Sequence, residues 1–593
     1  MRKALLVTAA AVTALGIAAM AAAGPARTKP TTFVVVYQTG ASPAAAHAAI
    51  KAAGGRLAHE NRDVGVATVV STNPRFVLDA SRSSALVGAA HNMPIGHVPA
   101  TKPHAAPKKF DLEKLQALRK PLKGYRQRIQ RFHHERAEPL APLQWDMQMI
   151  HATTTGSYAV QQGKKKVVVG IIDTGVDGTH PDIAPNFNGR LSRNFTTDIT
   201  SVPPDLGGDG PCEFPSCKDP ANHDDNGHGT HVASEIGSPI NGLGMAGIAP
   251  RVSLVNLRAG QDSGYFFVQA SVDALTYAGD HGIDVVNMSY YIDPWLFNCP
   301  ASAPAPEDSA ASRAEQQTII TATQRALDYA HAHGVTLIAA AGNSHMDEGH
   351  PTTDDTSPDF PSNAPYHRTV TNACLDLPTE GNNVMSISSI GPTKRKADYS
   401  NFGLEQITVA APGGFFRDDP WNPSLAGPPL GTNNPQSLAA GIPNEILAAY
   451  PKNVADAEGT LNPDGTPNTP FVVRDCNSKG TCAYYQWIQG TSMASPHAVG
   501  VAALIIAEYG KTHHGQFGLD PAKVEQILRR TATDTPCPEP RLHTYTDKGR
   551  PTSFNALCEG TTELNGFYGD GIVDALRAVE GGKHDHGHKH GKH

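Results

Sequence analysis

Four polar side chains in widely separated segments have the types that acyl transfer at a carbonyl requires. Asp173 lies in VVVGIIDTGVD, His228 in DDNGHGTHVAS, Asn343 in LIAAAGN and Ser492 in GTSMASPHAVG. They supply an acid, a base, an oxyanion donor and a nucleophile, which this chemistry uses together. The order Asp, His, Ser is one of the known chain orders for a serine triad. The sequence therefore predicts that these four residues meet in one site.

Ser492 follows Gly490 and Thr491 at the start of a strongly helical apolar run. A serine there is often only an N-cap. The same position also offers free N–H groups and the positive end of the helix dipole, which stabilise a developing oxyanion. Because a serine hydroxyl is a weak nucleophile, it needs a base, and His228 is our candidate.

His228 is flanked by glycines that let the backbone pass closely and leave the ring accessible. His231, three residues later, raises a zinc alternative. H-x-x-H lacks the Glu and the i,i+4 spacing of a helical zinc hydrolase, however. We therefore predict that His228 is the base and that His231 is a packed structural histidine.

Asp173 ends an apolar run, and its alternative role is a turn-forming Asp in Asp-Thr-Gly. Beside the other motifs we predict that it orients His228 and stabilises the imidazolium, because an unpaired buried carboxylate is costly. Asn343 follows small residues that allow a substrate side chain to lie against the backbone. Its amide is predicted to donate to the oxyanion together with the N–H of Ser492.

Apolar runs alternate with helical patterns from about residue 144 onward. Continuous Val and Ile runs are typical of strands covered on both faces, and strand–helix alternation favours a parallel α/β fold. Functional residues gather at the carboxyl ends of such strands, where Asp173 and Asn343 stand. The predicted elements are Val167–Ile172, His228–Ile236, Val252–Leu257, Val268–His281, Val285–Met288, Ala314–His333, Val335–Ala340, Ile407–Ala410 and Met493–Tyr509.

A smaller α/β unit without a catalytic constellation is predicted over residues 31–98. Residues 99–143 then hold 11 Lys and Arg against 4 Asp and Glu, interrupted by prolines, and we expect an exposed, protease-accessible linker. In the small unit we predict strands at Thr32–Tyr37 and Gly65–Ser71 and helices at Ala44–Ala53 and Pro74–Leu86.

The 593-residue chain is long enough for a large core with appendages, and its charge is unevenly spread. Residues 1–140 hold 20 Lys and Arg against 7 Asp and Glu, whereas residues 141–593 hold 29 against 49. We interpret this division as a basic N-terminal part and an acidic main part that do not stay together in the mature protein. No basic groove with interleaved aromatic residues appears in the acidic part, so we expect no nucleic-acid partner.

The N-terminus has the pattern of a secretory signal. Arg2 and Lys3 precede an apolar run from Ala4 to about Ala23, which ends in small residues. The alternative is a membrane anchor, but the run is Ala-rich and only marginally hydrophobic. We therefore expect a signal peptide over residues 1–23, a secreted, extracellular protein and no membrane partner.

All eight cysteines lie after residue 200 and none forms a C-x-x-C pair, which favours disulfides over metal binding. Local spacing favours Cys212–Cys217, Cys476–Cys482 and Cys537–Cys558, which leaves Cys299–Cys374.

Several segments have the composition of inserted loops or tails. Residues 197–222 are acidic and Gly-rich, and residues 293–313 and 413–486 are rich in Pro, Asn and Gly. Residues 581–593 end the chain in GGKHDHGHKHGKH, which either chelates transition metals or is a solvated end.

The motifs IIDTGVDGTHPDI, NGHGTHVAS, DVVNMSY, AAAGN and GTSMASPHAVGVAAL resemble the subtilisin-like serine proteases (subtilases) over roughly residues 144–580. The resemblance implies a three-layer α/β subtilisin-like fold with a mostly parallel central sheet of seven strands, and endopeptidase activity. By motif position, Asp173, His228 and Ser492 take the triad roles and Asn343 the oxyanion role. Residues 31–98 are similar to the family's ferredoxin-like α+β propeptide, which implies an intramolecular inhibitor and a self-inhibited zymogen.

The resemblance also implies a structural calcium ion. Its side-chain ligands correspond to Asp182, in His-Pro-Asp, and to Asn241. The carbonyl groups of Pro239, Leu243 and Met245 correspond to further oxygen ligands. The family's N-terminal Gln ligand has no clear counterpart in this chain. No organic cofactor is expected.

The chain departs from the family pattern near the expected substrate. After Asn-Met-Ser and an apolar residue, the family often has two glycines that line the first specificity pocket. Here Tyr291 and Ile292 follow instead, and their bulk would narrow this pocket or move its wall. Gly264-Tyr265 resembles the edge strand that pairs with extended peptide. The candidate substrate-binding residues are Gly264, Tyr265, Ser289, Tyr290, Tyr291, Ala340, Ala341 and Gly342.

We therefore expect a monomeric serine endopeptidase acting on peptides and proteins through an acyl-enzyme. A non-catalytic peptide-binding protein on the same scaffold is the main alternative, although such a protein needs no Asp-His-Ser set. A metal-binding secreted protein, in which the His-rich tail is the functional part, is the other.

Overall fold

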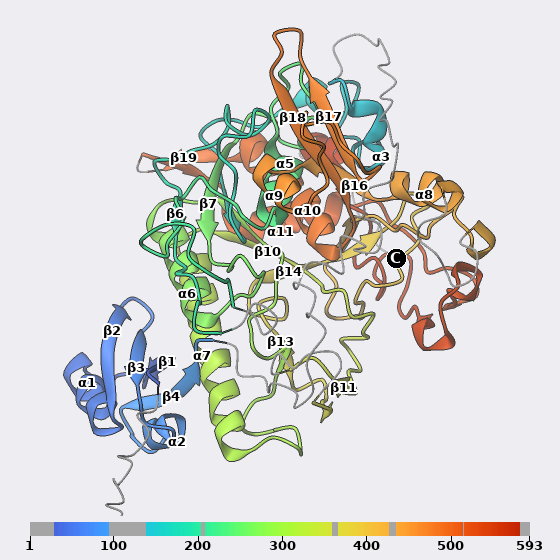
Figure 1. Ribbon diagram of the computed structural model, residues 1–593. Helices are drawn as coiled ribbons and strands as arrows, with labels where there is room; N and C mark the ends of the chain where they lie inside the picture. Colours follow the sequence, from blue (N-terminus) through green and yellow to red (C-terminus); the bar gives the residue numbers. More distant parts are fainter. Residues whose placement is uncertain are drawn as a thin grey trace, which may run out of the picture.

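The computed structural model describes residues 29–93, 138–202, 208–357, 366–425, 435–513 and 515–581. The predicted signal peptide, most of the predicted linker and the His-rich tail lie outside these residues. Figure 1 shows a large body and, at its lower left, a small N-terminal unit. No helix in the described part is long and apolar enough to cross a membrane.

Seven strands form the central sheet of the body, in the order β15-β14-β10-β8-β5-β7-β6, and neighbouring strands pair in parallel. The strands are β5 (Val168–Ile172), β6 (Arg193–Asn194), β7 (Ser253–Arg258), β8 (Val285–Met288), β10 (Thr336–Ala340), β14 (Val384–Ile390) and β15 (Val409–Pro412). All carboxyl ends therefore lie at one edge of the sheet, where a parallel α/β fold places its site.

Helices cover both faces of this sheet. Val169 and Ile171 of β5 enter the core under α5 and α10, whereas Ile172 enters the core under α6 and α7. Alternate side chains of one strand thus serve opposite cores, as the continuous apolar runs predict. The helices are α5 (His228–Gly237), α6 (Val268–Asp280), α7 (Ala310–Ala332), α10 (Thr491–Tyr509), α11 (Pro521–Thr531) and α12 (Ala575–Glu580). This arrangement confirms the predicted three-layer α/β fold.

The N-terminal unit has the element order βαββαβ and an antiparallel sheet in the order β2-β3-β1-β4, which is the ferredoxin-like arrangement. Its elements are β1 (Thr31–Tyr37), α1 (Pro43–Ala52), β2 (Gly55–Asn61), β3 (Val66–Ser71), α2 (Phe76–Ala80) and β4 (Leu86–His91). The structure thus contains the small α+β unit that the sequence predicts.

Two strands of this unit are absent from the sequence prediction, and one predicted helix is too long. The edge strand β2 is partly exposed and consists mostly of polar residues. It therefore lacks the apolar run by which a strand is predicted. The predicted helix Pro74–Leu86 shortens to α2, because β4 begins at its end. β4 is poor in large side chains since it lies close to α7, where a Cβ at Gly88 would approach Thr318 Oγ1 to 2.5 Å.

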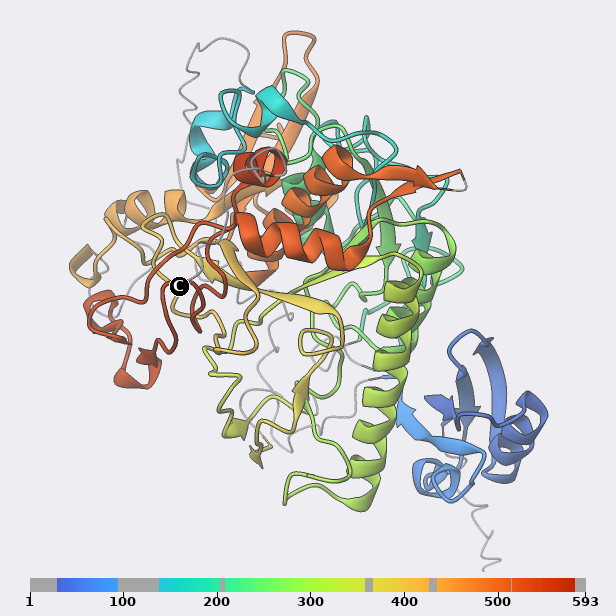
Figure 2. The ribbon, with the colours of Figure 1, turned by 180° about the vertical axis from the view of Figure 1, so that it is seen from behind.

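The N-terminal unit docks on α6 and α7 of the body (Figures 1 and 2). Asn61 donates to Asp273 of α6 at 2.9 Å, and the Arg325 guanidinium of α7 donates to the Tyr37 carbonyl at 2.8 Å. His91 of β4 lies 3.0 Å from Glu315 of α7. The contact thus surrounds a shared apolar core with polar bonds.

The predicted insertions are ordered in the described residues. A three-stranded antiparallel sheet of β16 (Ile446–Ala449), β18 (Cys482–Ile488) and β17 (Val472–Cys476) occupies the third one. All four predicted disulfides are confirmed: Cys212–Cys217, Cys299–Cys374, Cys476–Cys482 and Cys537–Cys558.

The remaining elements are short. The helices are α3 (Trp145–Met149), α4 (Ser157–Val160), α8 (Pro435–Gly441) and α9 (Lys452–Ala457). The paired strands are β9 (Phe297–Asn298) with β13 (Leu375–Asp376), β11 (Thr353–Asp354) with β12 (Arg368–Thr369), β19 (Lys511–His513) with β20 (Gln516–Gly518), and β21 (Leu542–His543) with β22 (Ala556–Leu557).

Candidate functional site

An acid–base pair lies at the carboxyl end of β5. Asp173 directly follows β5, and His228 is the first residue of α5. Nδ1 of His228 lies 2.8 Å from Oδ1 of Asp173, and both side chains are fully buried. Burial raises the pKa of the Asp173 carboxyl, and the imidazole and the Thr174 N–H counteract that rise. A carboxylate in this position fixes both the orientation and the tautomer of the imidazole.

The backbone around this pair leaves no room for a side chain at Gly229. A Cβ there would lie 2.1 Å from the Gly175 carbonyl oxygen and 2.9 Å from Cβ of Asp173. The Asp173 carbonyl also accepts the N–H groups of Ala259 and Gly260. The glycine after His228 therefore lets α5 begin directly against the turn that carries the acid.

Ser492 is the second residue of α10 and is almost fully buried. Its carbonyl accepts the Ser289 hydroxyl at 3.0 Å, and Ser289 in turn accepts the Asn287 amide at 2.8 Å. Oδ1 of Asn287 accepts the Ser495 hydroxyl at 2.8 Å. This chain of hydrogen bonds ties the first turn of α10 to the carboxyl end of β8.

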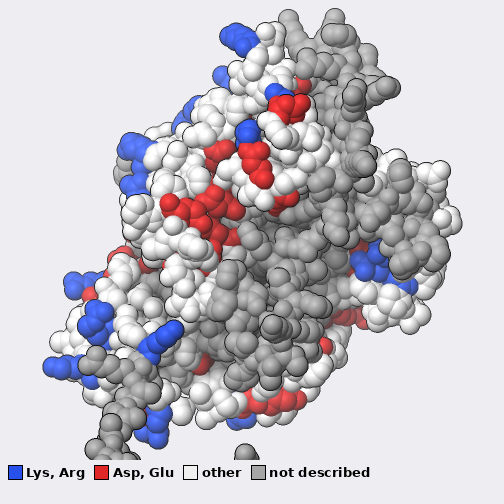
Figure 3. Space-filling model, in the orientation of Figure 1, with Lys and Arg blue, Asp and Glu red and all other residues white. Residues whose placement is uncertain are grey.

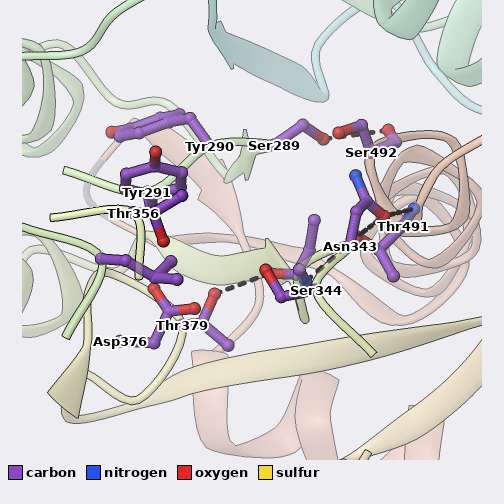
Figure 4. Close-up of a pocket in the computed structure, with 13 residues that line it drawn as sticks. Ser289, Tyr290, Tyr291, Asn343, Ser344, Thr356, Asp376, Thr379, Thr491 and Ser492 are labelled. Atoms are coloured by element: carbon purple, nitrogen blue, oxygen red, sulfur yellow. Dashed lines mark hydrogen bonds between the residues drawn. The ribbon is translucent and has the colours of Figure 1, made fainter. Parts of the chain in front are cut away.

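Thr491 orients the side chain of Asn343. The side-chain oxygen Oδ1 of Asn343 accepts both the N–H and the hydroxyl of Thr491 at 2.9 Å, while that hydroxyl accepts the Gly342 N–H at 3.0 Å. Because these bonds use the oxygen, the amide nitrogen points the other way, and Figure 4 shows it on the side of Ser492. The amide is thus directed as an oxyanion donor needs to be.

A buried ion cluster joins the helices that begin at His228 and Thr491. His497 of α10 lies 3.0 Å from Asp146 of α3 and 3.2 Å from Glu235 of α5. Glu235 also lies 2.8 Å from His231. Burial alone would lower the pKa of His497, but the hydrogen bonds to the two carboxylates raise it to about 10. His231 is therefore a packed structural histidine held by protein groups.

A cavity of about 150 Å³ adjoins Ser492 and Asn343 (Figure 4). Five of the predicted substrate residues line it, namely Ser289, Tyr290, Tyr291, Ala340 and Gly342. Leu296, Ser344, Thr356, Asp376, Thr379 and Thr491 also line it and were not singled out from the sequence. The adjacency of Thr491 to Ser492 was a usable signal, whereas Asp376 carries no local motif.

Three predicted substrate residues do not line this cavity. Ala341 is buried in the sheet, where its N–H donates to the Ile387 carbonyl at 3.0 Å. Gly264 and Tyr265 form a tight turn, in which the Gln261 N–H donates to the Tyr265 carbonyl at 2.9 Å. The segment predicted to be an edge strand is thus a turn between the bridged residues Gly260 and Phe266.

Protein side chains fill the loop that was predicted to hold calcium. Oδ1 of the buried Asp182 accepts the Asn241 amide at 3.0 Å. Oδ2 of Asp182 accepts the Met245 N–H at 3.2 Å and the Tyr485 hydroxyl at 3.0 Å. A Cβ at Gly244 would lie 1.7 Å from the same hydroxyl, so Tyr485 is packed into the loop.

Two further carboxylates bind the N–H groups of this loop. Glu138 accepts the Gly242 N–H and Asp475 accepts the Gly244 N–H, each at 3.0 Å. The side-chain oxygen of Asn241 accepts a backbone N–H at 2.9 Å. Calcium needs roughly six to eight oxygen ligands directed at the ion. Here the side-chain oxygens of the predicted set are directed at protein donors, so these residues do not fit calcium.

Other acidic side chains lie close together in the described residues. Carboxylate oxygens lie within 4.8 Å of one another in two groups, Asp198 with Glu213 and Asp219, and Asp219 with Asp225 and Asp262. The buried Arg258 guanidinium forms ion pairs of 2.5 Å with Asp219 and 2.6 Å with Asp262. The second group therefore already contains a protein cation.

Comparisons with known proteins agree with this fold. The model of the subtilase family matches residues 164–557. Subtilisin DY from Bacillus licheniformis is 26% identical over 375 residues, which cover 63% of this chain and 86% of that protein. Thermitase from Thermoactinomyces vulgaris is 23% identical over 415 residues, which cover 70% of this chain and 95% of that protein.

A solved structure shows the same overall fold. The crystal structure of the epidermin leader peptide processing serine protease (EpiP) from Staphylococcus aureus aligns with a TM-score of 0.58 at 19% identity. The alignment covers 93% of this chain and 99% of that one.

The ion cluster predicts a pH-dependent stability. Because the folded pKa of His497 is raised, its contribution is fully present below its unfolded pKa near 6.5 and is lost as pH rises through about 10. Between these values the stability advantage of the native chain over His497→Gln should shrink by up to about 1.4 kcal/mol per pH unit. Denaturant unfolding of both chains in a Ser492→Ala background measures it, and a pH-independent difference would contradict it.

The filled loop predicts stability without calcium. Tyr485→Phe removes a buried hydrogen bond to Asp182 and should destabilise the protein by about 1–3 kcal/mol. Calcium should shift the thermal midpoint of the native chain no more than that of Asp182→Asn, because an ion bound in this loop would stabilise only the chain that keeps the carboxylate. The matched control is Tyr484→Phe. It removes a hydroxyl that donates to the partly buried Gly465 carbonyl and does not contact Asp182. A calcium-dependent rise of the native midpoint that Asp182→Asn abolishes would refute this account.

Proposed function

The chain belongs to the subtilase family and is a serine endopeptidase, and we propose that it is secreted as a self-inhibited zymogen with a catalytic triad of Asp173, His228 and Ser492. The observation that carries the proposal is the buried 2.8 Å contact between Asp173 and His228 at the sheet edge. The same edge receives the N-terminus of α10, which carries Ser492.

In the proposed reaction, Ser492 Oγ attacks the peptide carbonyl carbon and His228 takes the hydroxyl proton. Since Nδ1 of His228 is hydrogen-bonded to Asp173, the atom that accepts the proton is Nε2. The imidazolium then protonates the leaving amine, and Asp173 stabilises the positive charge throughout. Water, activated by the same imidazole, hydrolyses the acyl-enzyme and restores the serine.

The proposed oxyanion site consists of the Asn343 amide and the N–H of Ser492. The two bonds from Thr491 support this role, because they hold the Asn343 side chain before substrate arrives. A donor that is already oriented needs no reorganisation as charge develops on the substrate oxygen.

The proposed propeptide is the unit at residues 31–98, joined by a linker at residues 99–143 to a peptidase domain at residues 144–580. Its docking on α6 and α7 supports an inhibitory role in the same chain. Figure 3 shows Lys and Arg on the N-terminal unit at lower left and patches of Asp and Glu on the body. Such complementarity favours association of the two parts.

The body begins before the proposed domain boundary. Leu140 is buried and donates its N–H to the Gly244 carbonyl at 2.7 Å, and Glu138 holds the same loop. Cleavage that separates the two parts is therefore expected before Glu138, within residues 94–137.

We also propose an extracellular monomer that cleaves peptides and proteins. The four disulfides support an oxidising compartment. For the metal, the proposal departs from the sequence expectation. Tyr485 and three carboxylates hold the loop at Asp182, and no calcium is assigned there.

Replacing Ser492 tests both the nucleophile and the zymogen. The secreted native chain should lose its N-terminal segment, whereas Ser492→Ala should retain it, because the variant lacks the attacking oxygen. Intact mass spectrometry of the two proteins measures this difference. A serine-directed phosphonate should also add its mass to Ser492 of the mature native enzyme alone.

Each other outcome changes the account. If both chains lose the segment identically, another protease matures them, and self-processing is rejected. If the folded mature enzyme takes no phosphonate and cleaves no peptide, the triad assignment fails, and the non-catalytic peptide-binding alternative gains support.

Crowding the docked face should release the N-terminal unit. A valine at Gly88 would push β4 away from Thr318 of α7, so Gly88→Val should weaken docking. In a Ser492→Ala background, trypsin nicks the basic linker and gel filtration then reports retention of the unit. The unit should stay bound in the parent and in Lys51→Ala, which is exposed on α1, and dissociate in Gly88→Val. Equal retention in all three would reject this interface as the one that holds the unit.

A further inference from the structure

The cavity beside Ser492 has a carboxylate at its far end. Figure 4 shows Ser492 and Asn343 at one side of the cavity and Asp376 at the other, with its oxygens directed inward. Asp376 is the last residue of β13 and is only 2% exposed. Its Oδ2 lies 3.6 Å from the position that a Cβ on Gly342 would take. The carboxylate therefore lies against the backbone that forms the cavity wall.

A second acidic side chain lies directly behind Asp376. Oε2 of Glu380 accepts the Asp376 N–H at 2.8 Å, and burial raises the pKa of Glu380 to about 7. Glu348 is fully buried nearby, and burial together with the charges of Glu380 and Asp376 raises its pKa. The charges of Glu380 and Asp376 thus disfavour the ionised form of Glu348, and a cation entering the cavity would offset the negative charge at this end.

The walls between the two ends are mostly apolar. Tyr290 stacks on Phe266 with ring centres 4.0 Å apart. This contact holds its ring as a wall of the cavity, so the ring does not occupy the cavity. Leu296 and Ala340 complete this part of the lining. A side chain that passes from Ser492 to Asp376 therefore meets apolar surface along its length and negative charge at its tip. Lysine and arginine have this division between an aliphatic stem and a cationic head.

We infer that this cavity binds the side chain of the residue on the amino side of the cleaved bond, and that Asp376 selects arginine or lysine there. The inference rests on the proposed function, because it assigns the cavity by its distance from the nucleophile Ser492. A neutral apolar side chain in the same place would bring no positive charge to the Asp376 carboxylate, whereas a cationic head beside it is favoured. Arginine suits the site further, because its guanidinium can bind one carboxylate through two N–H groups.

Peptides that differ only at this position test the inference. The mature enzyme is first titrated with a serine-directed phosphonate that carries no basic group, so that active sites are counted independently of specificity. The rate constant kcat/KM is then measured for matched fluorogenic peptides with Arg, Lys, Gln, Leu or Phe before the cleaved bond. We expect Arg and Lys to exceed the three neutral residues by at least about 10-fold.

Asp376→Asn provides the matched variant, since it removes the charge and keeps the shape. It should lower kcat/KM for Arg and Lys by about 10–100-fold and leave the neutral peptides within about 2-fold. Asp347→Asn is the control, because this acid lies outside the cavity lining and should leave the Arg-to-Leu ratio unchanged. The native preference stands as evidence by itself if Asp376→Asn does not fold.

The outcomes separate this inference from the proposed function. If the phosphonate labels Ser492 and neutral peptides are cleaved as fast as basic ones, the selectivity of Asp376 is rejected and the triad stands. If basic residues are preferred but Asp376→Asn keeps that preference, Asp376 is rejected as the selecting residue. If no label and no cleavage occur in folded enzyme, the triad and this inference both fall.

Discussion

Charges buried between α5 and α10 have to be neutralised inside the protein, and this requirement constrains the rest of the site. His497 carries a positive charge between Glu235 and Asp146, far from water. Such a group is tolerated only while its partners stay in place, since an uncompensated buried charge is strongly destabilising. Helix α5 starts at His228 and α10 starts at Thr491, each about two turns from the cluster. The same ion pairs therefore constrain the spacing of His228 and Ser492, the proposed base and nucleophile.

Much of the fold and the centre of the site could be predicted from the sequence because their signals are local. The apolar runs mark β5, β7, β8 and β10 directly, since a strand buried on both faces must be apolar throughout. The apolar run of β5 also predicts the position of Asp173 at its end. The helical run of α10 likewise predicts the position of Ser492 at a helix start. Short sequence separations gave three of the disulfides, and elimination gave the fourth.

The missed features depend on contacts between distant segments. β14 alternates Ile with buried Ser, and its Ser388 hydroxyl is satisfied by the Phe567 carbonyl, which no local pattern reveals. Tyr485, on a hairpin about 300 residues further along the chain, donates its hydroxyl to Asp182. The motif around Asp182 therefore could not predict this partner. Asp376 is likewise an ordinary acid in the sequence and becomes part of the cavity only through the fold. Motifs thus led to the proposed reacting groups, whereas tertiary contacts decide what surrounds them.

The apolar core under α6 and α7 continues into the N-terminal unit, where Val34, Val36 and Val66 belong to it together with Ile319 of the body. In the proposed maturation that core loses one wall, and the same helix surface must then face water. Evolutionary change on this surface is therefore limited from two directions. Residues there have to be apolar enough to hold the sheet during biosynthesis, yet not so apolar that the released enzyme self-associates through them. A substitution on this surface that does not affect the released body can thus still be selected against, because it weakens the contact with the N-terminal unit during biosynthesis.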